Sequence, residues 1–242
     1  RALRRARELV TAGADIIDIG GESTRPGAPP VTVQEELDRV LPVVEQVARE
    51  LPVPVSIDTS KPEVMQAALR AGAGMINDIR ALQMPGALAI AAGSRAAVCL
   101  MHMQGTPATM QVAPHYQDVV AEVKAFLAER IRVCEAAGIS RDRILIDPGF
   151  GFGKTLEHNL LLLKRLSEFR TLNTVLLVGL SRKATIGRLL GNVLPDERLY
   201  GSLAAAVIAA WQGAHILRVH DVRETAQALQ VCAAAMQIPT RP

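Results

Sequence analysis

Polar side chains that could bind or transform a small molecule stand at the ends of short apolar runs along this sequence. They are Asp18, Asp58, Asn77, Asp78, His102, Asp147, the stretch 181–183, Arg218 and His220. No set of histidines and carboxylates has the spacing of a transition-metal site, and the nucleophile pattern G-x-S-x-G is absent. We therefore expect chemistry by positioning and electrostatics rather than through a covalent intermediate.

The glycine-rich stretch ILIDPGFGFGKT, residues 144–155, raises the question of a nucleotide site. The phosphate-loop pattern G-x-x-x-x-G-K-[ST] needs glycine where Pro148 stands, and the dinucleotide pattern G-x-G-x-x-G needs one where Lys154 stands. Both nucleotide interpretations fail. The informative residue is Asp147, delivered at the end of a predicted strand, and for Lys154 the plain interpretation is a solvated side chain.

Some of these polar residues have a structural explanation. Asp78 is interpreted as a helix cap, whereas Asp58 is assigned to the site because Thr59 and Ser60 can cap the following helix without it. A lone histidine such as His102 is more often structural than a ligand.

Two cations end predicted strands where they would be costly without partners. Lys183 follows the apolar run TVLLVGL, and a cation there lies over the core unless something polar meets it. Arg218 and His220 are two apart on one predicted strand, so they share a face. The possible partners of Arg218 are a ligand or the side chains of Asp58, Asn77 and Asp147.

Seven short and mostly apolar segments are the predicted strands that position these side chains. They span 14–20, 55–58, 75–78, 97–101, 144–147, 175–180 and 215–219, and they alternate with eight helical modules, among them 1–12, 116–137 and 221–236. Strands that are apolar on both faces are typical of a parallel sheet covered by helices. A single α/β domain, residues 1–242, fits best as a (β/α)8 barrel that lacks its first strand and following loop; the alternative is a doubly wound open sheet.

Composition excludes several classes of function. The 242 residues hold 27 Lys and Arg against 24 Asp and Glu with 3% aromatics, so we expect no nucleic-acid partner. No apolar run is long enough to span a membrane, and a cytoplasmic location is expected. Three widely spaced cysteines, Cys99, Cys134 and Cys232, indicate small buried side chains rather than disulfides or a zinc cluster.

Seven ordered motifs resemble those of bacterial chromosomal dihydropteroate synthases. The motifs are IDIGGESTRPGA, SIDTSKPEV, INDIR, VCLMHMQGTPATMQ, ILIDPGFGFGK, LLVGLSRKATIG and GSLAAAVIAAWQGAHILRVHDVRET. This resemblance implies the (β/α)8 barrel and the joining of 6-hydroxymethyl-7,8-dihydropterin diphosphate to para-aminobenzoate, with release of pyrophosphate. It also implies magnesium as a cofactor, sulfonamides as inhibitors and a homodimer.

The resemblance also assigns site residues. It implies a pterin pocket of Asp58, Asn77, Met101, Asp147, Lys183 and Arg218, with Asp147 accepting paired N–H bonds from the ring. It implies pyrophosphate binding by Arg218 and His220, and aminobenzoate binding by Thr24, Arg25, Pro26, Phe152 and Lys183. The implied catalytic set is Asp58, Asp147, Lys183, Arg218 and His220.

This chain departs from the family pattern at two places. Ala184 stands where the family usually has a serine that helps to hold the aminobenzoate carboxylate, so we expect weaker binding, with Thr185 or backbone N–H groups as substitutes. The first strand and the loop that carries a magnesium-linked Asn are not in the sequence, so no metal ligand is assigned here. We expect poor stability and little activity until a strand and loop ahead of Arg1 are restored.

Two other functions stay open at this point. A pterin-binding methyltransferase domain shares the barrel and a similar Asp and Asn set, but is not expected to carry ESTRPG or SRKATIG. A pterin-binding protein without turnover is the second alternative.

Overall fold

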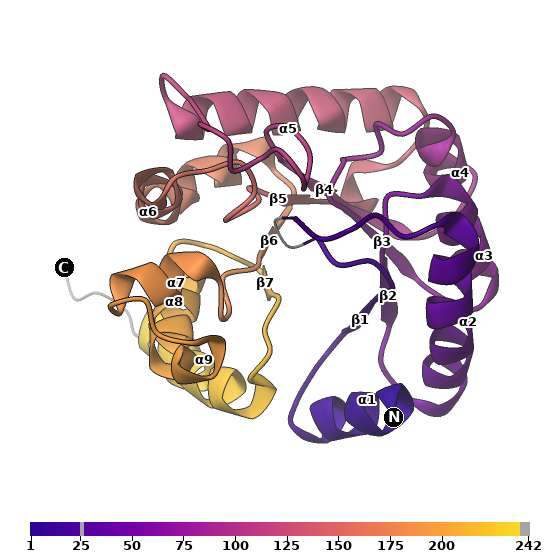
Figure 1. Cartoon of the computed structure of the whole chain (residues 1–242), viewed down its shortest axis with the longest axis horizontal. Coiled ribbons are helices and arrows are strands. Elements are labelled where there is room, and N and C mark those ends of the chain that lie inside the picture. The colour runs from indigo at the N-terminus through magenta and orange to yellow at the C-terminus, as the bar shows by residue number, and fades with distance from the viewer. Residues whose placement is uncertain (25–26, 238–242) are drawn as a thin grey trace.

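The structure, a computed structural model that describes residues 1–24 and 27–237, is an α/β fold built on one curved parallel sheet (Figure 1). Its strands are β1 (Ile17–Gly20), β2 (Val55–Asp58), β3 (Met75–Asp78), β4 (Ala97–Met101), β5 (Ile144–Asp147), β6 (Val175–Val178) and β7 (Ile216–Leu217). They pair in chain order from β1 to β7, all in parallel. Because a doubly wound sheet reverses its strand order part-way, the open-sheet alternative does not hold.

The helices surround the outer, convex side of this sheet (Figure 1). They are α1 (Ala2–Thr11), α2 (Val33–Glu50), α3 (Pro62–Arg70), α4 (Ala87–Ala92), α5 (Val119–Ala136), α6 (Leu156–Lys164), α7 (Ala184–Leu189), α8 (Leu199–Trp211) and α9 (Val222–Gln237). The described residues thus contain nine α-helices where eight modules are predicted, because both α7 and α8 follow β6. No helix in the described part of the chain is long and apolar enough to cross a membrane.

The sheet does not close. Within the described residues β1 and β7 are its two edges and are not paired with each other. A cavity of about 840 Å³ lies between these edges and extends to α1 and α9, where Leu9, Leu229 and Met236 help to line it. The structure therefore confirms a curved parallel sheet of seven strands, but not a complete eight-stranded barrel.

The predicted strand bounds hold in the middle of the sheet and fail at its ends. β2, β3, β4 and β5 have the predicted bounds, whereas β1, β6 and β7 are shorter than the predicted 14–20, 175–180 and 215–219. In the described part of the chain β7 pairs with β6 alone, through Ile216 and Leu217. Arg218 and His220 consequently lie in the loop after β7 rather than on the strand.

The start of α3 corrects another expectation. Its N-cap is Lys61, with Pro62 in the first turn, and no side chain caps it. The hydroxyls of Thr59 and Ser60 have other partners: Thr59 Oγ1 accepts from the Lys61 N–H at 3.2 Å, and Ser60 Oγ donates to Asp78. The predicted helix over 116–137 begins three residues later than expected, at Val119, where the carboxylate of Asp118 accepts from two backbone N–H groups.

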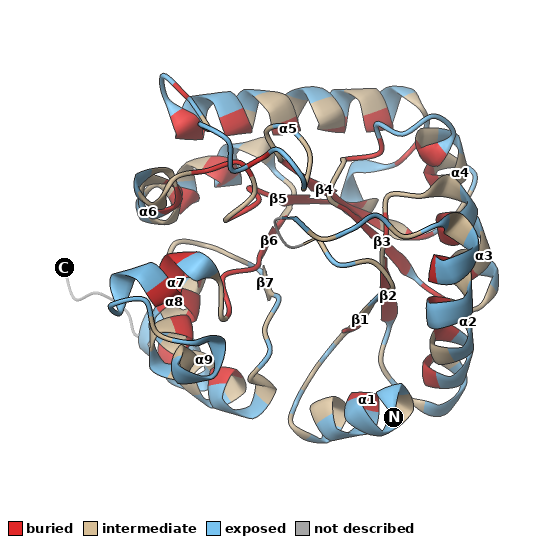
Figure 2. Ribbon diagram, in the orientation of Figure 1, coloured by how far each residue is buried: buried red, intermediate tan, exposed pale blue. Residues whose placement is uncertain are grey.

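Alternation along the strands separates an apolar layer from a polar one inside the sheet. Met75, Cys99, Leu145 and Leu177, one from each of β3 to β6, form a buried cluster on the inner face. Two positions further along, and so on the same face, stand Asn77, Met101 and Asp147 on β3 to β5, with Gly179 directly after β6. Most residues of β2 to β6 and the inward sides of the helices are buried, whereas most of β1 and β7 is only partly buried (Figure 2). The three cysteines are buried and free, as predicted.

Candidate active site

Parallel strand ends bring four of the predicted site residues to one edge of the sheet. Asp58 pairs in register with Asn77, and Met101 with Asp147. Asn77, Met101 and Asp147 are buried at their strand ends. Because the carboxyl ends of parallel strands all lie on the same side of the sheet, these residues form a continuous wall there.

Arg218 joins this wall from the loop after β7. Its Nε donates to Asp18 Oδ2 at 2.6 Å, and its Nη2 donates to Asp58 Oδ2 at 2.9 Å. Asn77 Nδ2 donates to the same Asp18 oxygen at 3.2 Å. Within the described residues the Arg218 side chain is therefore hydrogen-bonded to Asp58, as the sequence had allowed, and to Asp18 rather than to Asn77 or Asp147, although the charge of Asp147 also favours the guanidinium.

Asp18 is the residue that sequence reasoning noticed without giving it a role. It lies on β1 between two isoleucines, and the alternation I-D-I places it on the opposite side of the strand from Ile17 and Ile19. Its Oδ1 is buried and has no hydrogen-bond partner among the described residues. The alternation is the signal that could have marked Asp18 as a site residue.

The electrostatics of this wall follow from burial and like charge. Burial, with the charge of Asp18 adding to it, raises the pKa of Asp58 to about 7, while Arg218 opposes the shift. Burial lowers the pKa of Arg218, but Asp18 and Asp58 outweigh it, so the guanidinium stays charged. Two neighbouring carboxylates thus share one cation, and the charge of Asp18 helps to raise the pKa of Asp58.

Asp147 and Lys183 form the second half of the site. Asp147 Oδ1 accepts from the Gly149 N–H at 2.7 Å, which fixes the orientation of the carboxylate. Burial raises the pKa of Asp147 and Lys183 opposes this. Burial lowers the pKa of Lys183 to about 8, while Asp147 raises it.

Lys183 also contacts the glycine-rich loop 149–153. Its Nζ donates to the Phe150 carbonyl oxygen and lies 4.6 Å from the centre of the Phe152 ring, in a cation–π arrangement. The two residues assigned to aminobenzoate outside the 24–26 segment, Phe152 and Lys183, are therefore in contact.

Lys154 contradicts its sequence interpretation, because it is not solvated. The residue is 2% exposed, and its Nζ lies 3.0 Å from His102 Nδ1, 2.9 Å from the Gly149 oxygen and 2.9 Å from the Phe152 oxygen. Burial lowers the pKa of Lys154 to about 7, and burial together with the charge of Lys154 lowers the pKa of His102 to about 3. The structural interpretation of His102 is confirmed.

The glycines of this loop allow a close approach of backbones. A Cβ on Gly149, whose φ is +71°, would lie 1.9 Å from the His102 carbonyl oxygen, and one on Gly153 would lie 2.5 Å from that of Gln104. No side chain fits in either place. The glycines therefore let the loop turn tightly beside Asp147, and Lys154 holds the loop by donating to its carbonyl oxygens.

The remaining predicted residues are placed as follows. Asp78 accepts from the N–H groups of Arg80 and Leu82, both at 2.8 Å, so it is structural as predicted, although it caps a turn rather than a helix. His220 Nδ1 lies 3.0 Å from Ser181 Oγ. Thr24 is half-buried in the loop after β1, and Arg25 and Pro26 lie outside the described residues.

The two residues at the start of α7 differ in exposure. Ala184 is exposed and Thr185 is buried.

The combined set can recognise a flat polar ligand. Carboxylate and amide groups offer acceptors and donors on one wall, and Lys183 and Arg218 add cations beside them. Among residues 1–24 and 27–237, no three His, Cys, Asp or Glu side chains are grouped to hold a metal ion. Such a site suits a heterocycle with adjacent N–H donors and an attached anionic group.

Residues 1–220 match the family described as "Pterin binding enzyme". The chain belongs to this family. The dihydropteroate synthase of Escherichia coli (strain K12) is 59% identical over 235 residues, which cover 97% of this chain and 83% of that protein.

Solved structures agree with this assignment. The Yersinia pestis dihydropteroate synthase, solved in a sulfonamide drug complex, matches with a TM-score of 0.96 at 53% identity, covering 98% of this chain and 86% of the other. The Xanthomonas albilineans enzyme in complex with 7,8-dihydropteroate matches with a TM-score of 0.90 at 51% identity, covering 98% and 87%. The family predicted from the sequence motifs is confirmed.

Proposed function

We propose that this chain is a dihydropteroate synthase, which joins 6-hydroxymethyl-7,8-dihydropterin diphosphate to para-aminobenzoate and releases pyrophosphate. The proposal rests on one observation, made in a chain 59% identical to the E. coli synthase. Five residues converge at the carboxyl ends of the strands: Asp58, Asn77, Asp147, Lys183 and Arg218. Neither alternative has a comparable observation in its favour, since the matched relatives named above are all dihydropteroate synthases.

The pterin occupies the wall of strand ends. Asp147 accepts two N–H bonds from the amino-pyrimidinone edge, and its carboxylate is already oriented by Gly149. Asn77 and Asp58 complete the hydrogen-bonding edge, and Met101 supplies an adaptable apolar contact. The planar guanidinium of Arg218 lies over the flat ring.

The reaction is a substitution in which the C–O bond breaks ahead of attack. The bond electrons leave with the pyrophosphate, and the electron-rich dihydropterin stabilises the cationic methylene, whose charge Asp147 favours. Arg218 has N–H donors beyond the two bound to Asp18 and Asp58, and with His220 it stabilises the departing pyrophosphate. The neutral arylamine then forms the C–N bond and loses its proton, so no strong base is needed.

Aminobenzoate and sulfonamides share the loop side of the site. Phe152 packs on the aromatic ring and Lys183 lies beside it. The family resemblance assigns Thr24, Arg25 and Pro26 to the same ligand. We expect Ala184 to weaken the hold on the aminobenzoate carboxylate relative to relatives with serine there.

Magnesium remains a proposal that follows from the family resemblance. It would accompany the diphosphate and neutralise its charge. Because the described residues offer no group of three ligating side chains, they do not by themselves form a metal site, and no step above depends on the ion.

We further propose that an eighth strand closes the sheet into a (β/α)8 barrel. The unpaired edges β1 and β7 and the cavity of about 840 Å³ between them support this, because open edges are exposed to aberrant pairing. Extending the chain ahead of Arg1 by one strand and loop, a few tens of residues, should raise both the melting temperature and turnover. Unchanged values would contradict the closure.

A homodimer and a cytoplasmic location complete the proposal. The exposed apolar side chains of α8, Tyr200, Ile208 and Trp211, support a dimer contact there. Three free cysteines fit a reducing compartment, and continuous chain-order pairing fits one domain over residues 1–242. Light scattering on the parent and on Trp211→Glu tests the dimer.

A pyrophosphate-release assay tests the function. Release should require both the pterin diphosphate and para-aminobenzoate, and should be lost in Asp147→Asn but kept in Lys164→Gln, which changes an exposed lysine at the end of α6. Pterin binding without release would favour a binding protein, and methyl transfer from a methylfolate would favour the methyltransferase.

A further inference from the structure

Arg182 lies between two residues of the site, Ser181 and Lys183, and has an unusual backbone. Its φ is +56°, in the left-handed region that residues other than glycine rarely adopt. Such a conformation persists only where the surrounding contacts hold it. Neighbouring residues must therefore hold Arg182 in this conformation.

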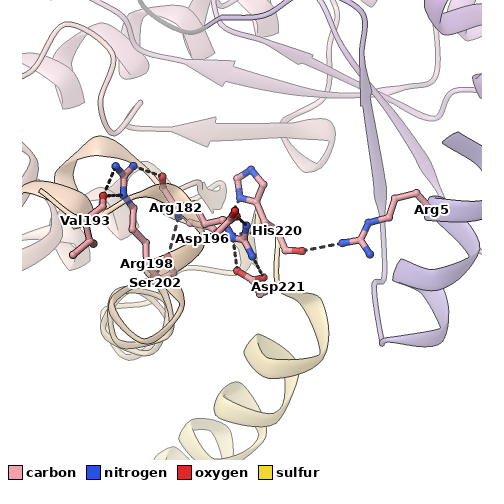
Figure 3. Close-up of polar contacts among 9 residues, drawn as sticks. Arg5, Arg182, Val193, Asp196, Arg198, Ser202, His220 and Asp221 are labelled. Atoms are coloured by element: carbon pink, nitrogen blue, oxygen red, sulfur yellow. Dashed lines mark hydrogen bonds and ion pairs between the residues drawn. The ribbon is translucent and has the colours of Figure 1, made fainter. Parts of the chain in front are cut away.

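The guanidinium of Arg182 is bound by two carboxylates (Figure 3). Its Nε donates to Asp221 Oδ2 at 2.9 Å and its Nη2 to Asp221 Oδ1 at 2.6 Å, which makes a two-bond, side-on pair. Its Nη1 donates to Asp196 Oδ1 at 2.7 Å. The Asp221 side chain is 15% exposed and that of Asp196 is 92% exposed, so the Asp221 pair is the stronger one.

The backbone of Arg182 is held as well. Its N–H donates to Ser202 Oγ and its carbonyl accepts from Arg198 Nη1, both at 2.9 Å. Arg198 also donates from Nε and Nη2 to the Val193 oxygen, at 3.0 and 2.8 Å (Figure 3). Contacts from the start of α8 and the loop before it thus hold the strained residue in place.

These contacts join the two loops that carry the cations of the site. Asp221 directly follows His220, and Ser181 directly precedes Arg182. Ser181 Oγ lies 3.0 Å from His220 Nδ1 and accepts from the His220 N–H at 3.2 Å. Two adjacent links, Ser181 with His220 and Arg182 with Asp221, therefore bridge the loop after β6 and the loop after β7.

We propose that Arg182 is a positioning residue, whose paired bond to Asp221 holds these two loops together so that Lys183 and His220 face the same substrate. The proposal rests on the proposed function and adds a residue to it. Three of the guanidinium N–H donors are engaged by carboxylates, so Arg182 acts through its neighbours rather than on the pyrophosphate itself.

Single substitutions test the link, with a matched control on the same arginine. Arg182→Gln and Asp221→Asn should each lower kcat/KM for the pterin diphosphate by about tenfold or more, while Asp196→Asn stays within twofold of the parent. The double variant should be no worse than either single one, because both remove the same interaction. Losses that multiply in the double variant, or an Asp196→Asn defect equal to that of Asp221→Asn, would overturn the proposal.

Two further variants separate positioning from a purely structural role. Arg182→Gly relieves the strain of the left-handed backbone, so this variant should fold well. Its kcat/KM should still be as low as that of Arg182→Gln. Arg182→Lys should recover only part of the activity, because an ammonium cannot make the paired bond. Full activity of the glycine variant would overturn the proposal.

A measurement on the free protein distinguishes failure of this inference from failure of the proposed function. The imidazole resonances of His220, assigned with His220→Gln, should move in Arg182→Gln and not in Asp196→Asn. If the parent shows no turnover but His220 moves in this way, the function is wrong and the positioning stands. Unmoved resonances would overturn the positioning role whatever the activity.

Discussion

The centre of the sheet and its two edges hold their polar side chains in different ways. In β2 to β5, pairing on both sides of each strand sets the position of Asn77 and Asp147, which are buried. At the edges, β7 has two residues and Arg218 lies beyond it; its backbone N–H donates to the Val178 oxygen, and its guanidinium is held by Asp18 and Asp58. Strand register positions the central side of the site, and ion pairs position the edge side.

We expect the two regions to have different functions in the reaction. A site built on strand register is rigid, which suits recognition of one planar ring. A guanidinium on a loop can exchange partners as charge develops on a leaving group, at a cost set by the carboxylates that it leaves. We therefore expect substitutions in the centre to abolish binding and substitutions at the edge to change turnover more than binding.

The largest effect is expected from Asp147→Asn. One oxygen becomes an NH2 group facing the donors of the pterin, and mispairing a buried charged hydrogen bond costs about 2–4 kcal/mol. Calorimetry should show this loss of pterin affinity with an unchanged melting temperature, and Asp142→Asn, on an exposed residue of the same segment, should leave affinity intact. An affinity within a factor of two of the parent would place the recognition wall elsewhere.

The next effect is a pH dependence of stability from Lys154, on the central side. Its pKa falls from 10.5 unfolded to about 7 folded, so between these values the unfolded chain binds more protons and stability rises with pH. Between pH 7 and pH 9 the gain is up to about 2 kcal/mol. Urea unfolding should show a pH slope that is smaller in Lys154→Met than in the parent by this amount, and the slope that remains comes from Lys183, whose lowered pKa of about 8 acts in the same direction.

The control for this pH dependence is a lysine that burial does not affect. Lys164 is exposed at the end of α6, so Lys164→Met should keep the slope of the parent. An equal slope in Lys154→Met and the parent would mean that the folded pKa of Lys154 is ordinary and that another group titrates.

Lys154 and Asp18 show where sequence reasoning fails. Alternation and apolar runs gave the bounds of β2 to β5 and the role of Asp147 as a strand-end residue, because those depend on neighbours in the chain. The burial of Lys154 depends on His102, which is 52 residues away, and the pairing of Asp18 depends on Arg218, which is 200 residues away. Contacts of this kind have no local pattern, so a charge in a glycine-rich loop was taken for a solvated one.

The edge strands fail for a related reason. Their apolar residues continue past the last pairing partner, so composition predicts longer strands than pairing allows. β7 ends at Leu217, which pairs with Val178, the last residue of β6. The expected face shared by Arg218 and His220 is consequently replaced by two separate contacts, one to Asp18 and Asp58 and one to Ser181.

A smaller effect is expected from Asp18→Asn, which breaks the edge arrangement. The substitution removes one of the two carboxylates on Arg218, so turnover should fall by about tenfold, or ~1.4 kcal/mol, at a partly exposed ion pair. Affinity for 6-hydroxymethylpterin should change by less than threefold. If affinity falls as much as turnover, the centre and the edge do not act separately.

The smallest effect is expected from Phe152→Ala, on the loop that lies between the two regions. Removing the ring takes away one wall of the aminobenzoate site and the cation–π partner of Lys183, interactions worth about 1 kcal/mol each. The lost ring contact with the ligand, about 1 kcal/mol, should raise the KM for para-aminobenzoate by roughly fivefold, while pterin affinity stays within twofold because Asp147 keeps its bond to Gly149. Arg25→Ala should have the same selectivity if the 24–26 segment closes over the second substrate.

Val112→Ala, which changes an exposed side chain near this face, should leave both constants unchanged. Equal losses for both ligands in Phe152→Ala would show that the loop and the strand ends form one pocket, and the contrast between rigid centre and adjustable edge would then have to exclude the loop.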